Sequence, residues 1–183
     1  MFTLAAAFLL AGPPRFLGPP EKKPANGEPA AVSPGDPAPI FSAPVRNADA
    51  AGTRHFDLAS LVGPRMSSAS PAKAVLISFF DRSCEACRSE LATLEALYTQ
   101  YKPHGLHVVS VTGNPAALLK AHAVTYPVVV DRDGAIVRRY LGPAPQYPAA
   151  VLVGSDGTVM SLKKGYRGDP AVLLRAEVEA ALR

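Results

Sequence analysis

Cys84 and Cys87 are the residues of this sequence best suited to carry out a reaction. They are the two cysteines in a chain of 183 residues, and two positions separate them. At this spacing, the second sulfur can attack a mixed disulfide formed by the first without a change in the backbone. With no further cysteine in the sequence, a disulfide between them would be local and reversible rather than part of a structural framework. The pair therefore predicts thiol–disulfide exchange.

A Cys-x-x-Cys pair can instead form half of a zinc site, for which His104 and His107 are the candidates. An intervening helix rises about 1.5 Å per residue and would hold His104 about 25 Å from Cys87, whereas a zinc bond is about 2.0 to 2.3 Å long. A metallochaperone module that uses both sulfurs without turnover is a further alternative, and it would need a third ligand near the pair. We predict neither a metal ion nor another cofactor.

The patterns around the cysteines predict a strand, a helix and a second strand. Residues 73 to 80, KAVLISFF, are nearly all apolar and rich in β-branched and aromatic residues, as in a central parallel strand buried on both faces. From Arg88 to Lys102, apolar residues recur at helical spacing until Pro103 ends the pattern. Residues 106 to 111 predict another buried strand, reached by a right-handed crossover.

This arrangement places the cysteines where a central strand ends and a helix begins. Unpaired backbone N–H groups and the positive end of the helix dipole would stabilise a thiolate there. Cys84, at the exposed tip of the helix, is the predicted nucleophile. Cys87, one turn further along, is predicted to resolve the mixed disulfide.

The remaining patterns complete an α/β fold. Ser155-Asp156-Gly157 separates two apolar segments, and Asp-Gly accepts the positive φ angles of a tight hairpin turn. We therefore expect a central mixed sheet with flanking helices, closed by an antiparallel hairpin. The other predicted elements are a helix from Asn114-Pro115, a strand at 128–130, the hairpin strands at 149–153 and 158–162, and a last helix at 170–182, while residues 133–141 fit no single period.

Glu90 is the candidate proton partner of the dithiol. The resolving thiol must lose its proton, because the thiolate is the attacking species. Glu90 follows Cys87 by three residues, on the same helix face and on the stripe that continues to Leu91 and Leu94. Burial on this stripe would raise the pKa of the carboxyl group toward neutrality. The alternative is an ordinary glutamate of a first helical turn, favoured there by the helix dipole.

Composition divides the chain into three parts. Residues 1 to 12 are apolar and shorter than the roughly 20 residues of a transmembrane helix, but their length suits an export signal or a membrane contact. Residues 13 to 34 are predicted to be a Pro-rich linker, since nine of the 19 prolines lie between positions 13 and 39. Residues 35 to 183 are predicted to form one domain, working outside the cytoplasm.

Charge and composition exclude some classes of partner. A hydrophobic content of 48% is enough for a folded core. The net charge of +4 is small, and Lys and Arg are scattered rather than gathered in a stripe. Nucleic acid is therefore not an expected partner. The sequence Asp131-x-Asp133-Gly134 lacks the further acidic ligands of a calcium loop, and it is interpreted as a turn.

The segment from Phe79 to Glu90, FFDRSCEACRSE, resembles the active-site segment of TlpA-like thiol–disulfide oxidoreductases of the thioredoxin-fold superfamily, which have a redoxin or AhpC/TSA-like domain. Residues 35 to 39, GDPAP, resemble the opening motif of that family. The resemblance covers residues 35 to 183. It implies a thioredoxin-like fold and an extracytoplasmic, often membrane-tethered reductase, which in some members acts on apocytochrome c.

This sequence departs from the family on both sides of the first sulfur. Ser83 stands where an aromatic residue usually precedes the first cysteine, and Ala86 stands where the family commonly has proline. These positions bear on substrate choice and redox potential. Exchange itself needs the nucleophile, the resolving thiol and the helix terminus, all of which are present.

Tyr147 and Pro148 resemble the cis-proline loop of the same family. An X-Pro bond is the kind of peptide bond for which the cis form costs little. A cis bond would turn the backbone so that the main chain of Tyr147 is offered to a bound substrate peptide. The resemblance also bears on Glu90, because some TlpA-like proteins have glutamate there, whereas thioredoxins proper have a buried acid on the preceding strand, at the position of Ser78.

The predicted function is reduction of disulfides in a protein substrate, with an upstream thiol as the electron donor. The sequence does not show whether reduction or oxidation is the physiological direction. A peroxiredoxin-like thiol peroxidase is an alternative and would have a Pro-x-x-x-Thr-x-x-Cys segment. Ile77 and Asp81 occupy the positions of its proline and threonine, which favours the oxidoreductase.

Overall fold

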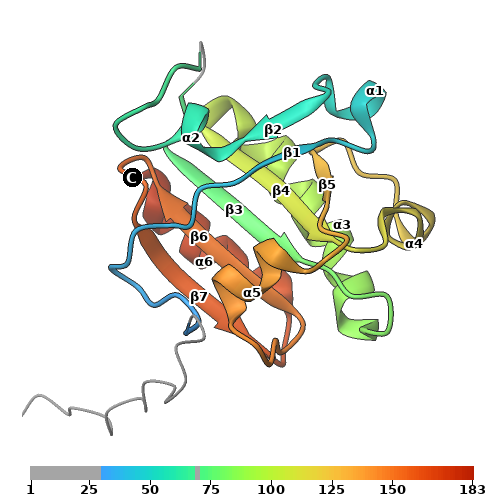
Figure 1. Cartoon of the computed structure of the whole chain (residues 1–183). Coiled ribbons are helices and arrows are strands. Elements are labelled where there is room, and N and C mark those ends of the chain that lie inside the picture. Colours follow the sequence, from blue (N-terminus) through green and yellow to red (C-terminus); the bar gives the residue numbers. More distant parts are fainter. Residues whose placement is uncertain (1–29, 69–70) are drawn as a thin grey trace, which may run out of the picture.

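A five-stranded mixed sheet forms the centre of the molecule in the computed structural model, which describes residues 30–68 and 71–183 (Figure 1). The strands lie in the order β5-β4-β3-β6-β7. The first three are mutually parallel, β6 is antiparallel to β3, and β7 is antiparallel to β6. The mixed sheet predicted from the sequence is confirmed. Its strands are β3 (Ala74–Phe79), β4 (Leu106–Thr112), β5 (Val128–Val130), β6 (Ala149–Gly154) and β7 (Val159–Lys164).

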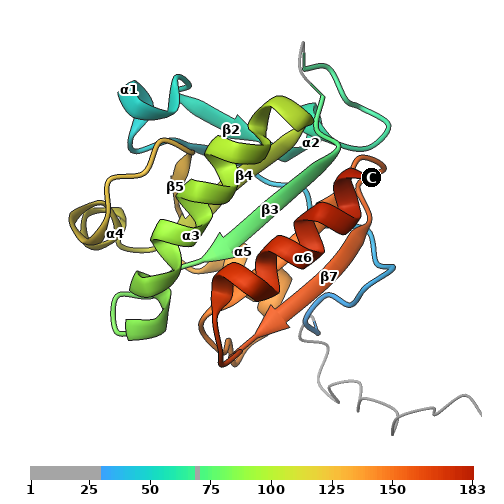
Figure 2. The same cartoon turned by 180° about the vertical axis from the view of Figure 1, so that it is seen from behind.

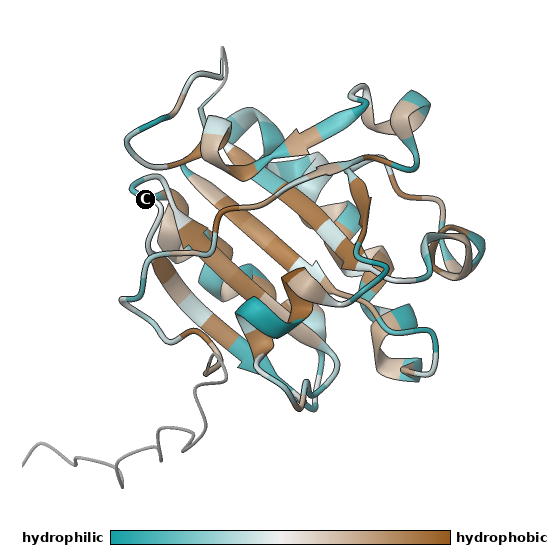
Figure 3. Cartoon of the chain, in the orientation of Figure 1, coloured by the Kyte–Doolittle hydropathy of each residue, from teal (hydrophilic) through white to brown (hydrophobic). Residues whose placement is uncertain are grey.

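β3 is the middle strand of this sheet, and all six of its residues are buried. It pairs along its whole length with β4 on one side and β6 on the other. A strand with helices or other layers on both faces needs apolar side chains on both, which explains the continuous apolar run in the sequence. Figure 3 shows the same hydrophobic character in the neighbouring central strands.

Two helices cover one face of the sheet, α3 (Glu85–Tyr101) and α6 (Pro170–Leu182) (Figure 2). They share one apolar cluster with the strands beneath them, to which α3 contributes Leu91, Leu94 and Leu97. The apolar periodicity indicated this helix only from Arg88, whereas α3 begins at Glu85 with Cys84 as its N-cap, in agreement with the predicted place of Cys84 at the helix tip. The apolar stripe starts only at Leu91, so hydrophobic periodicity carries no information about the first turn.

The opposite face is covered by α5 (Ala135–Leu141) and by a two-stranded antiparallel sheet of β1 (Ser42–Pro44) and β2 (His55–Asp57), which lie in front of the main sheet in Figure 1. The rings of Phe41 and Phe56 stack at 5.4 Å between centroids. This second sheet was not predicted, since each strand has three residues and is too short for a periodic signal. The short helices α1 (Ala48–Ala51) and α2 (Leu58–Leu61) flank β2.

The ambiguous residues 133–141 contain α5, which begins after the turn interpreted from the sequence. The Asp131 carboxylate accepts hydrogen bonds from the backbone N–H groups of Ile136 (3.1 Å) and Val137 (2.8 Å). Asp131 is itself buried, so the helix start provides the hydrogen bonds that a buried carboxylate needs. This local use of Asp131 accounts for the acidic pattern without a metal ion.

Caps and turns formed where the sequence predicted them. Asn114 accepts a hydrogen bond from the Ala117 N–H at 3.1 Å and starts α4 (Pro115–Ala121). Between β6 and β7, Asp156 accepts from the Thr158 N–H at 2.9 Å, and Gly157 has a φ of +84°. A 3₁₀ turn (Lys102–His104) containing Pro103 follows α3. The closing hairpin is thus confirmed.

The N-terminal predictions concern residues that lie mostly outside the described part. Residues 1 to 12 and the linker up to residue 29 are not described. Val32, the first buried residue of the described chain, donates its N–H to the Tyr140 carbonyl at 3.0 Å. Among residues 30–68 and 71–183, no helix combines the length and the apolar character needed to cross a membrane.

Candidate active site

Cys84 and Cys87 form a disulfide at the junction of β3 and α3, with their Cα atoms 5.2 Å apart. Cys84 is partly exposed, whereas Cys87 is 2% exposed. The sulfur of Cys84 caps the helix by accepting a hydrogen bond from the Cys87 N–H at 3.0 Å. In the reduced protein, the same N–H and the dipole of the 17-residue helix would stabilise a Cys84 thiolate.

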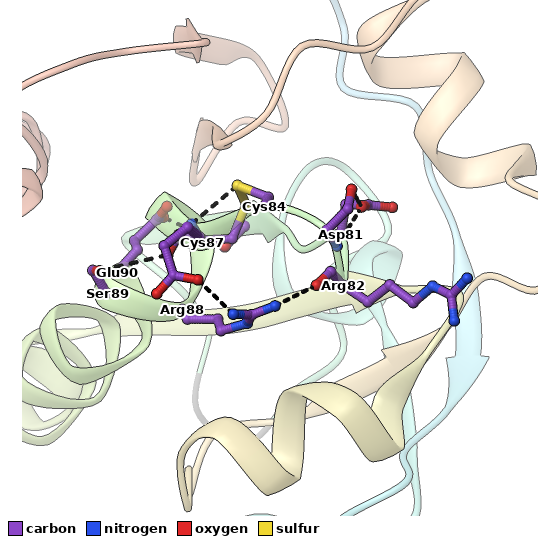
Figure 4. The surroundings of a disulfide bond; sticks show 10 residues. Asp81, Arg82, Cys84, Cys87, Arg88, Ser89 and Glu90 are labelled. Carbon is purple, nitrogen blue, oxygen red and sulfur yellow. Dashed lines mark hydrogen bonds and ion pairs between the residues drawn. A yellow bond between two sulfur atoms is a disulfide. The ribbon is translucent and has the colours of Figure 1, made fainter.

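The loop before Cys84 is held by its own side chains. Asp81 accepts hydrogen bonds from both the N–H (2.8 Å) and the hydroxyl of Ser83, and its carbonyl accepts from the Cys84 N–H at 3.1 Å. Arg88, one turn into α3, donates to the Arg82 carbonyl at 2.8 Å (Figure 4). Ser83, which departs from the family pattern, therefore stabilises the turn that precedes Cys84.

Glu90 lies on the α3 turn after Cys87 and is 1% exposed (Figure 4). Burial raises the pKa of its carboxyl group from 4.5 to about 7, although the nearby hydroxyl groups of Tyr166 and Ser78 work in the opposite direction. The Ser78 hydroxyl, on β3, donates to the carboxylate at 3.5 Å. A carboxyl group with this pKa exchanges protons in the neutral range, where thiols and thiolates interconvert.

Tyr166 is a member of this site that the sequence did not reveal. It lies in the connection between β7 and α6; its buried hydroxyl makes no hydrogen bond among the described residues, but it is near enough to Glu90 for the carboxyl to raise its pKa. It is 76 positions beyond Glu90 in the sequence, and a single tyrosine after Gly165 has no local pattern that links it to the dithiol. Ser78 was recognised by its position on the strand but not as a hydrogen-bond donor to Glu90.

Tyr147 and Pro148 lie beside the same end of β3. Their peptide bond is cis, as predicted, and it is the one cis bond in the described part of the chain. β6 starts at the next residue, Ala149, which pairs with Phe79 at the end of β3. Burial and the negative charges of Asp81 and Asp131 raise the pKa of the half-buried Tyr147. The cis-proline loop and the cysteine loop therefore occupy the same edge of the sheet.

The histidines weighed as zinc ligands lie elsewhere. His104 is in the 3₁₀ turn after the C-terminal end of α3, and His107 is in β4 near its start, whereas the cysteines are at the N-terminal end of α3. Within the two described ranges, no three His, Cys, Asp or Glu side chains are gathered as a metal site.

Residues 34–162 of the chain match the AhpC/TSA family. Among curated proteins, the thiol-disulfide oxidoreductase ResA of Bacillus thuringiensis subsp. konkukian is 28% identical over 98 residues, which cover 51% of this chain and 56% of the relative. ResA of Bacillus subtilis is 26% identical over 98 residues, or 51% of this chain and 54% of that protein. The chain therefore spans about half the length of the curated relatives that it matches.

Solved structures with the same fold cover about four fifths of the chain. A protein from Chlorobium tepidum assigned as thiol:disulfide interchange protein DsbE has a TM-score of 0.67 and 23% identity, covering 84% of this chain and all of that one. The thioredoxin domain of a thiol-disulfide oxidoreductase from Bacteroides vulgatus has a TM-score of 0.59 and 20% identity, covering 81% and 99%. A secreted disulfide oxidoreductase from Mycobacterium tuberculosis has a TM-score of 0.55 and 20% identity, covering 78% and 93%. The thioredoxin-like fold implied by the sequence is confirmed.

Proposed function

The chain belongs to the AhpC/TSA family, and we propose that it works as a thiol–disulfide oxidoreductase that reduces disulfides of a protein substrate. One observation carries this proposal: the Cys84–Cys87 disulfide lies at the N-terminus of α3, with one sulfur accessible and the other buried. This asymmetry supports different roles for the two sulfurs, with Cys84 as the nucleophile and Cys87 as the resolving thiol. The names of the ResA relatives support the same chemistry.

Reduction of a substrate proceeds in two exchange steps. The Cys84 thiolate attacks one sulfur of the substrate disulfide, forming a mixed disulfide, and the other substrate sulfur leaves as a thiolate that takes up a proton. The Cys87 thiolate then attacks the Cys84 sulfur, which forms the disulfide of the present structure and releases the second substrate thiol. Two electrons pass to the substrate, and an upstream dithiol must return them.

Glu90 is proposed to accept the proton of Cys87 before the second step. Cys87 is buried, and burial without a proton acceptor would keep its thiol protonated and unreactive. Glu90 is on the same face of α3, and its pKa of about 7 lets it hold or release a proton near neutral pH. The alternative, an ordinary first-turn glutamate at the surface, does not describe a side chain that is 1% exposed.

Tyr147 and Pro148 are proposed to bind the substrate chain beside the disulfide. The pairing of Ala149 with Phe79 brings the cis-proline loop next to the segment that leads to Cys84. The cis bond supports a role for the Tyr147 main chain in pairing with an extended peptide. We expect Pro148→Ala to lower the rate of mixed-disulfide formation between a Cys87→Ser variant and a peptide disulfide, with Pro103→Ala as the proline control far from the cysteines.

The proposed place of action is outside the cytoplasm, with contact to the membrane through residues 1 to 12 as one form of attachment. The length of that apolar segment supports export, as does the fold shared with a secreted oxidoreductase. Fractionation of cells that produce the full chain, or the chain without residues 2 to 12, tests this. Equal retention of both in the cytoplasm would contradict it.

Equilibration of the purified protein with glutathione buffers tests the central proposal. The Cys84–Cys87 pair should exchange reversibly, with a potential near the roughly −270 mV of thioredoxin for a reductase and near about −120 mV for an oxidant. Cys84→Ser should abolish exchange. Absence of reversible exchange in the unmodified protein, or consumption of hydrogen peroxide that survives Cys87→Ser, would favour the thiol peroxidase instead.

A further inference from the structure

We propose that Tyr166 is a positioning residue for Glu90, whose ionised carboxylate it stabilises through a hydrogen bond from its buried hydroxyl. Tyr166 would thereby set the pH range in which Cys87 can give up its proton. This inference rests on the proposed role of Glu90 as the proton acceptor. Tyr166 belongs neither to the motif around the cysteines nor to the cis-proline loop.

The first step is the position of the Tyr166 hydroxyl. It is buried and makes no hydrogen bond within the described chain, and the Glu90 carboxylate is close enough to raise its pKa. A buried hydroxyl without a partner is unfavourable, typically by about 1–3 kcal/mol. The Glu90 carboxylate, itself 1% exposed, is an acceptor with two oxygens. The two groups therefore satisfy each other once Glu90 is ionised.

The second step is the direction of the hydrogen bond. Burial and the neighbouring Glu90 carboxylate raise the pKa of Tyr166, so its hydroxyl keeps its proton throughout the working range of a thiol enzyme. An ionised carboxylate can only accept hydrogen bonds. Tyr166 must therefore be the donor and Glu90 the acceptor. Such a bond favours the charged form of Glu90 over the neutral form.

The third step is the set of groups that face Glu90 from the surrounding elements. Ser78 on β3 donates at 3.5 Å, Tyr166 approaches from the β7–α6 connection, and Cys87 lies one turn back on α3. Tyr126, before β5, is near enough for the Glu90 charge to raise its pKa, and its hydroxyl oxygen accepts a hydrogen bond from the Ser110 hydroxyl at 3.3 Å. Among the described residues that shift the pKa of Glu90, none carries a positive charge. Hydrogen-bond donors are therefore what stabilises its charge.

Tyr166→Phe removes the donor while keeping the aromatic ring. We would follow the pH dependence of Cys87 alkylation in the reduced protein, and in parallel the carboxyl ¹³C chemical shift of Glu90. Both midpoints should move upward by about one pH unit relative to the unmodified protein, because the carboxylate loses a buried donor. An unchanged Glu90 midpoint in a folded Tyr166→Phe protein would overturn the proposal.

Tyr140→Phe is the matched control. Tyr140 is a fully buried tyrosine on the opposite face of the sheet, and its hydroxyl donates to the Pro39 carbonyl at 2.8 Å. Removing this hydroxyl should lower stability and leave the Glu90 midpoint unchanged. A shift of equal size in both variants would show a general effect of lost packing and would also overturn the proposal.

Two further measurements separate the possible failures. If Glu90→Gln leaves the pH profile of Cys87 unchanged, the proton-acceptor role fails, and the ¹³C titration of Glu90 in Tyr166→Phe still decides the inference about Tyr166. If Tyr166→Phe does not fold, the ring ¹³C shift of Tyr166 in the unmodified protein replaces it. That shift should titrate together with Glu90, and a Tyr166 signal that is constant through the Glu90 midpoint would overturn the proposal.

Discussion

The two faces of the central sheet bury similar strands in different chemical surroundings. On the face toward β1, β2 and α5, the strand residues Ile77, Phe79 and Val111 belong to one apolar cluster. On the face toward α3 and α6, the next positions along the same strands include Ser78 and Ser110, both buried. Because successive side chains of a strand point to opposite faces, β3 and β4 contribute to both surroundings at once.

The difference concerns a buried carboxyl group on the face that carries the disulfide. Burying a carboxyl group is unfavourable unless hydrogen bonds compensate for the lost water. Glu90 is nonetheless buried on the α3 face, with Ser78 and Tyr166 as its neighbours. Both faces carry an apolar cluster, but the face with α3 also holds the buried Glu90 and Ser78 near the disulfide.

The largest expected effect concerns the apolar face. Ile77→Ala should destabilise the protein by about 2–5 kcal/mol, because Ile77 is completely buried and its removal leaves a cavity. Urea unfolding of the oxidised protein measures this. The redox potential of the folded variant should match that of the unmodified protein. A changed potential would show that the two faces are not separate in function.

A second prediction concerns the pH dependence of stability and belongs to the polar face. The pKa of Glu90 is about 7 in the folded protein, whereas an unburied glutamate, as in the unfolded chain, has a pKa of 4.5. The folded state therefore binds the proton more tightly. Its contribution is fully present below pH 4.5 and is lost as the pH rises through 7, a decrease of about 3 kcal/mol by linkage. Unfolding free energies at pH 4 to 8 measure it.

Glu90→Gln is the control for this pH dependence, because the amide does not titrate. The fall in stability between pH 4.5 and 7 should be smaller in this variant by the same amount. An identical pH profile in both proteins would mean that Glu90 is not the buried group responsible.

A smaller effect is expected for Ser78→Ala, the neighbour of Ile77 on the opposite face. At 3.5 Å, the Ser78 hydrogen bond to Glu90 is long, and its loss should cost about 1 kcal/mol at pH 8 and less at pH 4. The dependence on pH arises because the bond favours the ionised carboxylate. Chemical unfolding at both pH values measures the difference. A loss as large as that of Ile77→Ala would remove the contrast between the faces.

The smallest effect is expected at the surface of the cysteine loop, outside both faces. Arg88 pairs with Glu85, and the two side chains are 46% and 81% exposed. Exposed pairs contribute about 0–1 kcal/mol, so Arg88→Ala should change the unfolding free energy within that range. Thermal unfolding at low and high salt measures it. A loss of several kcal/mol would place this loop among the main determinants of stability.

The local sequence was sufficient for the central strand, the hairpin and the position of the cysteines. The apolar run at β3 is a local signal, because its residue types alone indicate a buried strand. The turn at Asp156-Gly157 and the Asn114 cap are local as well, because neighbouring residues bond to their backbone groups. Hydrophobic periodicity alone indicated α3 only from Arg88, three residues after its true start at Glu85. Its first turn is capped by a cysteine sulfur and has no apolar stripe.

By itself, the sequence determined the chemistry of this protein, since two cysteines at this spacing before a helix define a dithiol that can open and close. The tertiary structure decided the surroundings in which that chemistry takes place. The proximity of Glu90 to Ser78 and Tyr166, like the edge-to-face contact of the Phe41 and Tyr140 rings, joins residues from separate elements of the chain. Such contacts leave no periodic signal, because they depend on how the strands and helices pack rather than on the residues next to them.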